Sequence, residues 1–193
     1  MTEITNDMVL RAQQGDEDAS RELVAGLQRP VIATIFRFLG SGYRREVEDL
    51  AQEVFLKVFR AIDRFDPSRA KFTTWVYTFV RNHCFDVLKK RRLKTATMNN
   101  VGEDGTDRDF PDERELQPTE SAENTELGRR IGEALSTLGE DQRMVFVLRE
   151  YEKLDYREIA KITGVNEGTV KSRLFRAKES LRKQLAPYLE AGA

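Results

Sequence analysis

Apolar side chains recur along this chain every three or four residues, the spacing that gathers them on one face of an α-helix. The clearest stripe runs from Val47 to Ile62, with acidic residues at its start and basic residues at its end, as the helix dipole favours. The same spacing predicts further helices over residues 7–14, 17–27, 30–39 and 72–92. Pro30 is expected in the first turn of its own helix, where a missing N–H does no harm. Because no segment alternates apolar and polar residues as a strand does, the sequence predicts an all-α fold.

The helical pattern stops after residue 94 and resumes near residue 126. Residues 95–125 contain two prolines and no apolar face, and residues 103–126 hold ten acids against two arginines, a net charge of −8. Such a composition cannot bury enough apolar surface to fold, so a flexible acidic linker is predicted. The chain is therefore expected to form two small helical domains, residues 1–94 and 126–193, joined by this linker.

Within the second domain, residues 155–178 have the layout of a helix-turn-helix. Asp155 and Glu158 form a capping pair at the start of a short helix that ends at Gly164. Asn166 then caps the last helix. The helices predicted for this domain span residues 126–138, 144–151, 155–163 and 166–185. An ordinary helical hairpin has the same spacing, so the spacing alone leaves both possibilities open.

Charge favours the helix-turn-helix, because the last helix has one apolar face and one basic face. Residues 169–183 carry six basic residues and one acid, which offer donors to phosphates and to base edges. The candidate DNA-binding residues on the basic face and its flanks are Lys171, Ser172, Arg173, Phe175 and Arg176. An aromatic ring on a polar face suits a thymine methyl group in the major groove, which would explain Phe175. The alternative is that Phe175 packs on a neighbouring helix of its own domain.

A second basic cluster, residues 81–94, follows a segment rich in aromatic residues. Basic grooves with exposed rings suit single-stranded nucleic acid, because each unpaired base can stack on a ring. Helical spacing assigns most positions here to the core instead, with His83 among them. The other predicted core positions are Phe72, Val76, Phe79, Val80 and Val87. Trp75, Tyr77 and Phe85 remain as candidates for stacking on bases.

Composition excludes several other classes of protein. The chain has 193 residues with 32 Lys and Arg against 33 Asp and Glu, so affinity for nucleic acid must come from local clusters of charge. One cysteine and one histidine exclude a disulfide framework and any site that needs two of either residue. No catalytic residue, metal site or cofactor is predicted. The polar N-terminus and the lack of a run of about 18 apolar residues predict a cytoplasmic protein without membrane insertion.

Six short motifs follow one another in order. They are EDLAQEVF at 48–55, KVFR at 57–60, FTTW at 72–75, RN at 81–82, YREIA at 156–160 and GTVKSRLFRA at 168–177. Together they resemble the bacterial sigma factors of the extracytoplasmic-function group, over nearly the whole chain except the linker. The resemblance implies that residues 5–94 grip the clamp helices of the RNA polymerase β′ subunit and read the melted minus-10 element. It implies that residues 126–190 read the minus-35 element with their last helix.

Carried over residue by residue, the resemblance implies three sets of binding residues. The set that faces polymerase is Asp49, Gln52 and Glu53. These residues share the polar face of the 47–62 helix, for which plain solvation is the alternative role. The set for minus-10 DNA is Lys71, Phe72, Trp75, Arg81 and Asn82, with Lys71 and Arg81 on the DNA backbone. The set for minus-35 DNA is the group of residues already noted on the last helix: Lys171, Ser172, Arg173, Phe175 and Arg176.

The resemblance also implies that an anti-sigma protein masks both domains until a signal arrives, and the free chain is expected to be a monomer. Two positions depart from the family pattern: Gly139 stands where proline is common, and His83, Cys84 and Phe85 replace small aliphatic residues.

Two other functions compete with that of a sigma factor. An autonomous DNA-binding regulator would dimerise on paired half-sites, and a nuclease that held Mg²⁺ with linker carboxylates would lack a rigid scaffold.

Overall fold

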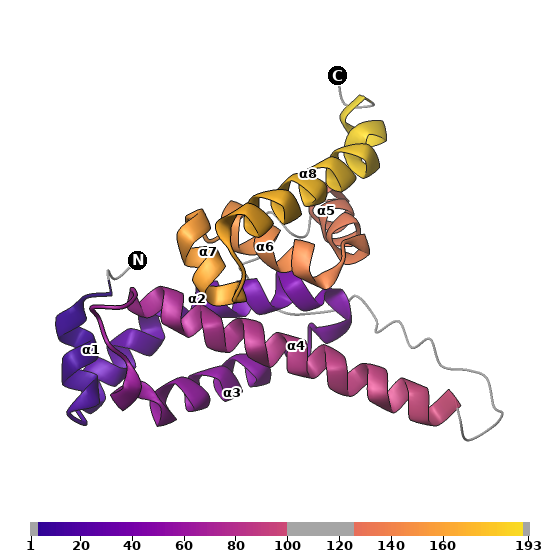
Figure 1. Cartoon of the computed structure of the whole chain (residues 1–193). Coiled ribbons are helices and arrows are strands. Elements are labelled where there is room, and N and C mark those ends of the chain that lie inside the picture. Colours follow the sequence, from indigo (N-terminus) through magenta and orange to yellow (C-terminus); the bar gives the residue numbers. More distant parts are fainter. Residues whose placement is uncertain (1–3, 100–125, 191–193) are drawn as a thin grey trace.

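The computed structural model describes residues 4–99 and 126–190, and every regular element in these ranges is helical (Figure 1). The N-terminal half contains α1 (Asn6–Gln13), α2 (Glu17–Leu39), α3 (Val47–Arg60) and α4 (Phe72–Asn99). Two 3-10 helices, η1 (Ser41–Tyr43) and η2 (Ile62–Arg64), flank α3. The C-terminal half contains α5 (Glu126–Thr137), α6 (Glu140–Glu150), α7 (Tyr156–Thr163) and α8 (Glu167–Glu190). The predicted all-α class is confirmed.

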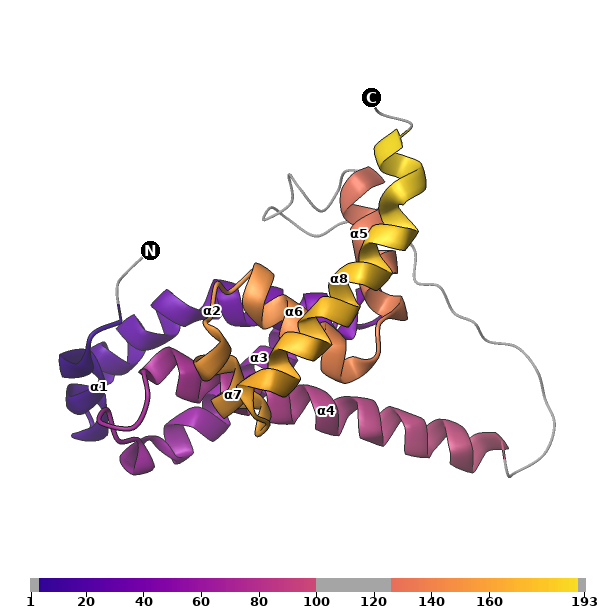
Figure 2. The same ribbon diagram turned by 45° about the horizontal axis from the view of Figure 1, so that its top comes forward.

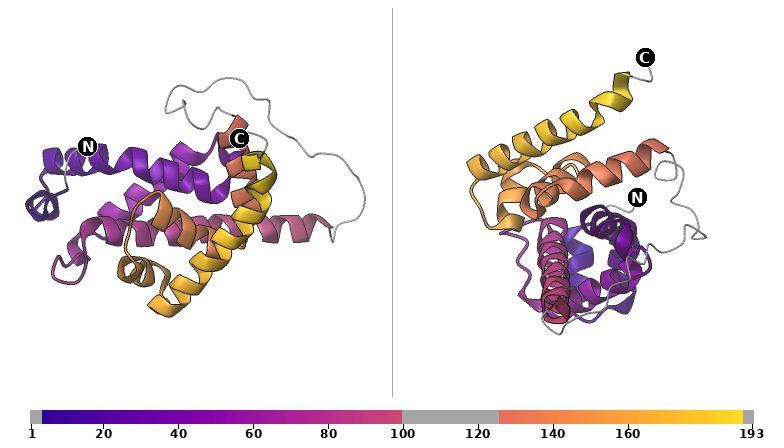
Figure 3. Two further views of the ribbon diagram at one scale, coloured as in Figure 1. Left: turned by 90° about the horizontal axis from the view of Figure 1, so that it is seen from above. Right: turned by 90° about the vertical axis from the view of Figure 1, so that its right-hand side faces the viewer.

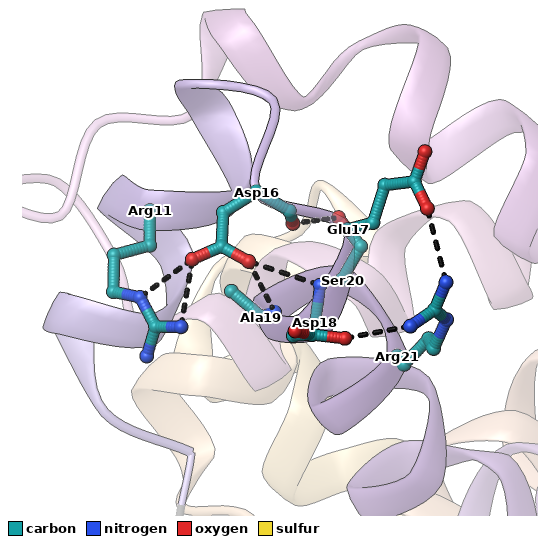
Figure 4. A network of polar contacts seen from close by, with 7 residues as sticks. All are labelled: Arg11, Asp16, Glu17, Asp18, Ala19, Ser20 and Arg21. Carbon is teal, nitrogen blue, oxygen red and sulfur yellow. Dashed lines mark hydrogen bonds and ion pairs between the residues drawn. The ribbon is translucent and has the colours of Figure 1, made fainter.

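The turn between α1 and α2 is held by Asp16, the N-cap of α2 (Figure 4). Its carboxylate accepts hydrogen bonds from the backbone N–H groups of Asp18 and Ala19, at 2.9 and 3.0 Å. The Arg11 guanidinium, near the end of α1, donates to the same carboxylate at 2.8 Å. The bonds from Ala19 and Arg11 hold the pKa of Asp16 below its usual range. Because Asp16 bonds to both helices, it sets the angle at which α1 meets α2.

Pro30 does not begin a helix, contrary to the prediction, and α2 runs through it without a break. A proline inside a helix removes one hydrogen bond and costs about 3 kcal/mol. Buried apolar residues continue at helical spacing on both sides of the proline. They are Leu23, Leu27, Val31 and Ile35. Burial of this continuous stripe offsets the cost of the proline, so tertiary packing overrides the local signal.

The last part of α4 is longer than predicted and continues to Asn99. Thr95, the predicted first residue of the linker, donates from Oγ1 to the carbonyl of Arg91 one turn earlier, at 3.1 Å. No glycine or proline interrupts the chain before Gly102, so nothing ends the helix earlier. Residues 100–125, the rest of the predicted linker, lie outside the described residues. Figure 1 shows the last turns of α4 extending beyond the body of the molecule.

The two halves stack on each other, with the C-terminal helices lying across α2 and α4 (Figures 2 and 3). α7 packs on α4, while α5 and α6 pack on α2. One group of buried apolar residues runs from the N-terminal half into α6, α7 and the start of α8. A smaller group joins α5 to the rest of α8. The sequence pattern did not predict the contact between the halves, because periodicity identifies a buried face but not its partner.

Candidate functional site

The predicted helix-turn-helix is formed by α7 and α8. The Asp155 carboxylate accepts the N–H of Glu158 at 2.7 Å, and the Glu158 carboxylate accepts the N–H of Asp155 at 3.0 Å. Gly164 ends α7 at a φ of 70°, a left-handed conformation that glycine adopts without strain. The Asn166 side chain accepts the N–H of Thr169 at 2.8 Å and so caps α8. These caps fix both ends of the turn and leave α8 on the surface.

α8 presents to solvent the face that the sequence predicted. Its fully buried residues are Val170, Leu174, Ala177 and Leu181. Lys171, Ser172 and Arg176 are exposed on other sides of the helix. Phe175 is 68% exposed, so it does not pack on a neighbouring helix of its own domain. Arg173 differs, because its guanidinium pairs with Asp141 of α6 at 2.7 Å and ties the two helices together.

Arg149 and Tyr156, which were not among the candidate DNA-binding residues, lie beside this basic surface. The Arg149 guanidinium lies 4.9 Å from the ring centre of Tyr156 and donates to the Leu154 carbonyl at 2.7 Å. The Lys171 ammonium lies 5.6 Å from the same ring centre. Arg149 comes from α6 and Tyr156 from α7, so only the packing of these helices brings them beside α8. No periodicity or spacing in the sequence could have indicated this arrangement.

The candidate aromatic residues of α4 are less accessible than predicted. Phe72 is buried, as its helical spacing predicted, with its ring centre 5.2 Å from that of Phe65, so it is not placed for the direct DNA contact that the resemblance implied. It faces inward because it is the first apolar position of the stripe that packs α4 into the core. Tyr77 is also buried, which raises its pKa. Trp75 and Phe85 are half-buried against other aromatic rings and keep part of their surface exposed.

The polar candidates of α4 lie on its outer sides. At about 100° per residue, Lys71, Trp75 and Asn82 fall within about 40° of one another. Arg81 lies beside Asn82 and donates to its side-chain oxygen at 2.9 Å. The Lys71 ammonium pairs with the Glu158 carboxylate of α7 at 3.0 Å, and this hydrogen bond raises the pKa of Lys71. The structure therefore brings four of the five minus-10 candidates to one region of the surface.

The exposed face of α3 carries Asp49, Gln52 and Glu53, as predicted. Leu56 lies on the same face and is 57% exposed, a large apolar surface among polar neighbours. A face that combines carboxylates, a carboxamide and an exposed leucine is suited to a protein partner, because such contacts have an apolar centre and a polar rim. α3 itself is held in place by the burial of its opposite side.

His83 lies directly beneath this face. The Lys57 ammonium lies 2.7 Å from His83 Nδ1, and the Glu53 carboxylate lies 3.6 Å from His83 Nε2. An ammonium can only donate, so Nδ1 accepts and the proton of the neutral ring is on Nε2, pointing toward Glu53. Burial, with the charge of Lys57 as a second cause, lowers the pKa of His83. The predicted core histidine thus lies between Glu53, on the exposed face of α3, and Lys57 beside that face.

The lowered pKa of His83 predicts a loss of stability in acid. The unfolded chain binds this proton with an ordinary pKa of about 6.5, so protonation favours unfolding as the pH falls below that value. The free energy of unfolding is measured with urea at about pH 7.5 and at about pH 5.5. Between these two pH values it is expected to fall less for His83→Gln than for the natural chain. An equal loss in both proteins would show that His83 is not the group responsible.

No group of three or more metal-ligating side chains occurs within the described ranges. Cys84 is fully buried, and burial raises its pKa to about 12, so it stays a thiol at neutral pH. None of the helices described is long and apolar enough to cross a bilayer.

Known proteins resemble both halves of the chain. The family model "Sigma-70 region 2" matches residues 23–94, and "Sigma-70, region 4" matches residues 128–181. The chain is 34% identical to the RNA polymerase sigma-H factor of Pseudomonas aeruginosa over 186 residues, which cover 94% of each protein. It is 34% identical to the ECF RNA polymerase sigma-E factor of Escherichia coli strain K12 over 197 residues, covering 98% of this chain and 99% of that protein.

Two solved structures have a similar fold. The sigma factor RpoE in complex with the anti-sigma factor NepR from Bartonella quintana gives a TM-score of 0.66 at 23% identity, covering 86% of this chain and 96% of that one. CnrH in complex with the cytosolic domain of CnrY gives a TM-score of 0.63 at 22% identity, covering 96% of this chain and 97% of that one. The helical arrangement described above is therefore shared with these proteins.

Proposed function

Because this chain belongs to the extracytoplasmic-function group of RNA polymerase sigma factors, it directs core RNA polymerase to promoters, and we propose which of its surfaces performs each step. Residues 1–94 bind polymerase and the minus-10 element, and residues 126–193 bind the minus-35 element. The chain works as a binding factor in the cytoplasm and has no enzymatic activity of its own.

The basic face of α8 is proposed to read the minus-35 element in the major groove. The observation that carries this proposal is Phe175, which is 68% exposed between cations on a capped helix of a helix-turn-helix. Exposure of a phenylalanine in water is unfavourable, whereas contact with a thymine methyl group would bury it. Lys171, Ser172 and Arg176 supply donors to base edges and phosphates beside it. Arg173 serves to hold α8 on α6 through Asp141.

The exposed face of α3 is proposed to bind the clamp helices of polymerase. Asp49, Gln52 and Glu53 give it polar specificity, and Leu56 gives it an apolar centre. His83 supports this face from beneath by its contacts with Lys57 and Glu53.

The start of α4 is proposed to read the melted minus-10 element. Asn82 offers a donor and an acceptor to a base edge, and Lys71 and Arg81 contact the DNA backbone. Trp75 stacks on a base with the part of its ring that is exposed. Phe72 acts differently from a contact residue: it anchors the first turn of α4 to Phe65 and so positions Lys71 and Trp75.

A regulator of the anti-sigma type is proposed as a further partner. One protein of the same fold was solved as a sigma factor bound to an anti-sigma factor. No cofactor or metal is needed for this function, since every proposed step is recognition of protein or DNA. The free chain is proposed to be a monomer.

In vitro transcription with core RNA polymerase on genomic fragments tests the proposed function. Specific transcripts that require the added chain are expected, and their start sites define the promoter. An autonomous regulator would instead bind its sites without polymerase and would add no start sites. Absence of any specific transcript from all fragments would overturn the proposal.

The first residue-level prediction compares two exposed cations of α8. Arg176→Ala is expected to weaken binding to the minus-35 element by about 1 to 3 kcal/mol and to reduce base preference, because Arg176 lies where a recognition helix meets base edges. Lys183 lies two turns later on α8. Lys183→Ala is expected to reduce the slope of log affinity against log salt concentration by about one, and to leave base preference unchanged. Binding isotherms on matched and mutated minus-35 duplexes measure both. Equal, sequence-independent effects would show that α8 contacts only the DNA backbone.

A further inference from the structure

One side chain of α1 is tied to the segment that joins α3 to α4. The Gln13 carboxamide nitrogen donates to the Ile62 carbonyl at 2.8 Å and to the Phe65 carbonyl at 3.0 Å. These two residues stand 49 and 52 positions further along the chain, so the contact is a tertiary one. A carboxamide nitrogen carries two N–H donors, and here each donor has its own acceptor. α1 therefore holds the connecting segment where it leaves α3 (Figure 1).

The two bonds from Gln13 close the end of η2. The last carbonyls of a helix lack partners within the helix, and Phe65 directly follows η2. Ile62 and Phe65 are both buried, and the bonds from Gln13 are part-buried, so water does not replace them freely. An apolar side chain or a carboxylate at position 13 would have no hydrogen to donate to these carbonyls.

Gln13 is a fixed donor because α1 is itself fixed on α2. Met8, Val9 and Ala12 of α1 are buried. The Arg11 guanidinium pairs with the Asp16 carboxylate at 2.7 Å, in the turn that leads into α2 (Figure 4). The Gln13 side chain thus extends from a helix whose position is set by packing and by this ion pair.

Phe65, whose carbonyl Gln13 holds, lies against the aromatic residues at the start of α4. Its ring centre is 5.2 Å from that of Phe72 and 5.4 Å from that of Trp75. On its other side Trp75 packs edge-on against Phe79, with ring centres 4.8 Å apart. Trp75 is half-buried between these rings. The position of Phe65 therefore determines how the exposed part of the Trp75 ring is presented.

The rest of the connecting segment is held mostly by local bonds. The Asp66 carboxylate accepts the backbone N–H and the hydroxyl of Ser68, at 2.9 and 2.7 Å. These bonds shape the turn but do not fix its position relative to α4. Lys161 of α7 donates to the Arg69 carbonyl at 2.6 Å from an exposed position, where water competes for the ammonium. The part-buried bonds from Gln13 are thus suited to fix the segment against α4.

We propose that Gln13 is a positioning residue for recognition of the minus-10 element: by holding the backbone at Ile62 and Phe65, it keeps Phe65 against Trp75 and so orients Trp75 for stacking on an unpaired base. The inference rests on the proposed function, in which Trp75 contacts the melted strand. Gln13 itself contacts no DNA. Its effect depends on supporting a binding side chain from behind, and a recognition site loses precision when such support is removed.

The test compares Gln13→Met with Gln14→Met in the full chain. Methionine has about the length and helix propensity of glutamine but no N–H donor, so only the two bonds are lost. Gln14 is the exposed neighbour, where the same substitution breaks no side-chain bond described above. Gln13→Ala is a second variant, which removes the donors without adding apolar bulk. Val9→Ala lowers stability by leaving a cavity under α1 while it keeps Gln13, and circular dichroism checks that every variant is folded.

The first measurement is the fluorescence of Trp75, the only tryptophan of the chain. In Gln13→Met and Gln13→Ala, Phe65 is no longer held against the indole ring. Their emission is expected to shift to longer wavelength, and their acrylamide quenching constant is expected to rise. Gln14→Met and Val9→Ala are expected to match the natural chain. This measurement needs neither polymerase nor DNA.

The second measurement is the base preference of the holoenzyme. Promoter fragments with a pre-melted minus-10 element, taken from a promoter found by the transcription assay, are substituted one base at a time on the non-template strand. In Gln13→Met, the ratio of affinities for the natural and the substituted base is expected to fall about fivefold at one position, the smallest loss expected when one base stack is removed. A general loss of stability would lower both affinities together and leave this ratio unchanged.

Gln13 variants that match the natural chain in either measurement would overturn the proposal. The same holds if Val9→Ala shifts the Trp75 emission and the affinity ratio as much as Gln13→Met does, because Gln13 would then have only a structural role. Failure of the proposed function is seen separately, since the natural chain would then give no promoter-specific transcript. In that case the role in DNA recognition falls with it, while the fluorescence still shows whether Gln13 holds Phe65 against Trp75.

Discussion

Replacing Glu53 by lysine together with Gln52 by alanine is expected to abolish binding to core RNA polymerase while leaving the fold intact. Both side chains are exposed on α3, opposite the stripe that holds this helix in the core. A reversed charge at a complementary interface costs several kcal/mol, which corresponds to a loss of affinity of at least about a hundredfold. Fluorescence anisotropy with labelled chain and core polymerase measures the change.

The matched control for this variant is Glu22→Lys with Gln28→Ala. Both of these residues are exposed on α2, in the same half of the chain, and neither belongs to the proposed polymerase surface. The control is expected to bind core polymerase as the natural chain does. Natural affinity in the Glu53→Lys, Gln52→Ala variant would mean that polymerase binds a different face.

Arg143→Ala is expected to destabilise the chain by about 3 kcal/mol, the largest stability effect that the structure predicts for one polar side chain. The substitution leaves the buried carbonyls of Phe38 and Leu138 without this donor and also removes the part-buried bond to the Ser136 carbonyl. For a chain of this size, the loss corresponds to a fall in melting temperature of about 6 to 12 °C. Thermal unfolding followed by circular dichroism measures it.

Arg182→Ala serves as the comparison for Arg143→Ala. Arg182 lies on α8 in an exposed pair with Glu179, and such surface pairs contribute at most about 1 kcal/mol. Its melting temperature is expected to stay within about 4 °C of the natural value. Similar melting temperatures for both variants would show that Arg143 does not join the ends of α2 and α5 in solution.

Helical geometry alone predicted which faces of α3 and α8 are exposed. The face of α8 with Phe175 and Arg176, and the face of α3 with Gln52 and Glu53, are exposed where the residue spacing placed them. Both predictions succeeded because an amphipathic helix has one apolar side, and the opposite side must then face solvent. The caps at Asp155 and Asn166 were equally predictable, since a cap depends on residues within one turn.

Predictions failed where distant parts of the chain decide the outcome. Pro30 was expected to start a helix, but the buried stripe of α2 continues across it. The resemblance implied that Phe72 contacts DNA, but its ring is buried beside Phe65, in the core position that helical spacing predicted. Tyr77 was a candidate for stacking on bases, but it donates to Glu152 of the other half. For Pro30 and Tyr77, packing against parts of the chain far away in the sequence removed the break or the exposure that local spacing suggested.

The sequence by itself determined the helical class, the helix-turn-helix and the two charged faces of this sigma factor, because periodicity, caps and charge act within a few residues. Only the tertiary structure decided that the halves share one core and that Glu158 pairs with Lys71. It alone also placed His83 between Lys57 and Glu53. Such contacts depend on how helices are packed against one another, and the amphipathic pattern of a helix does not specify the surface that covers it.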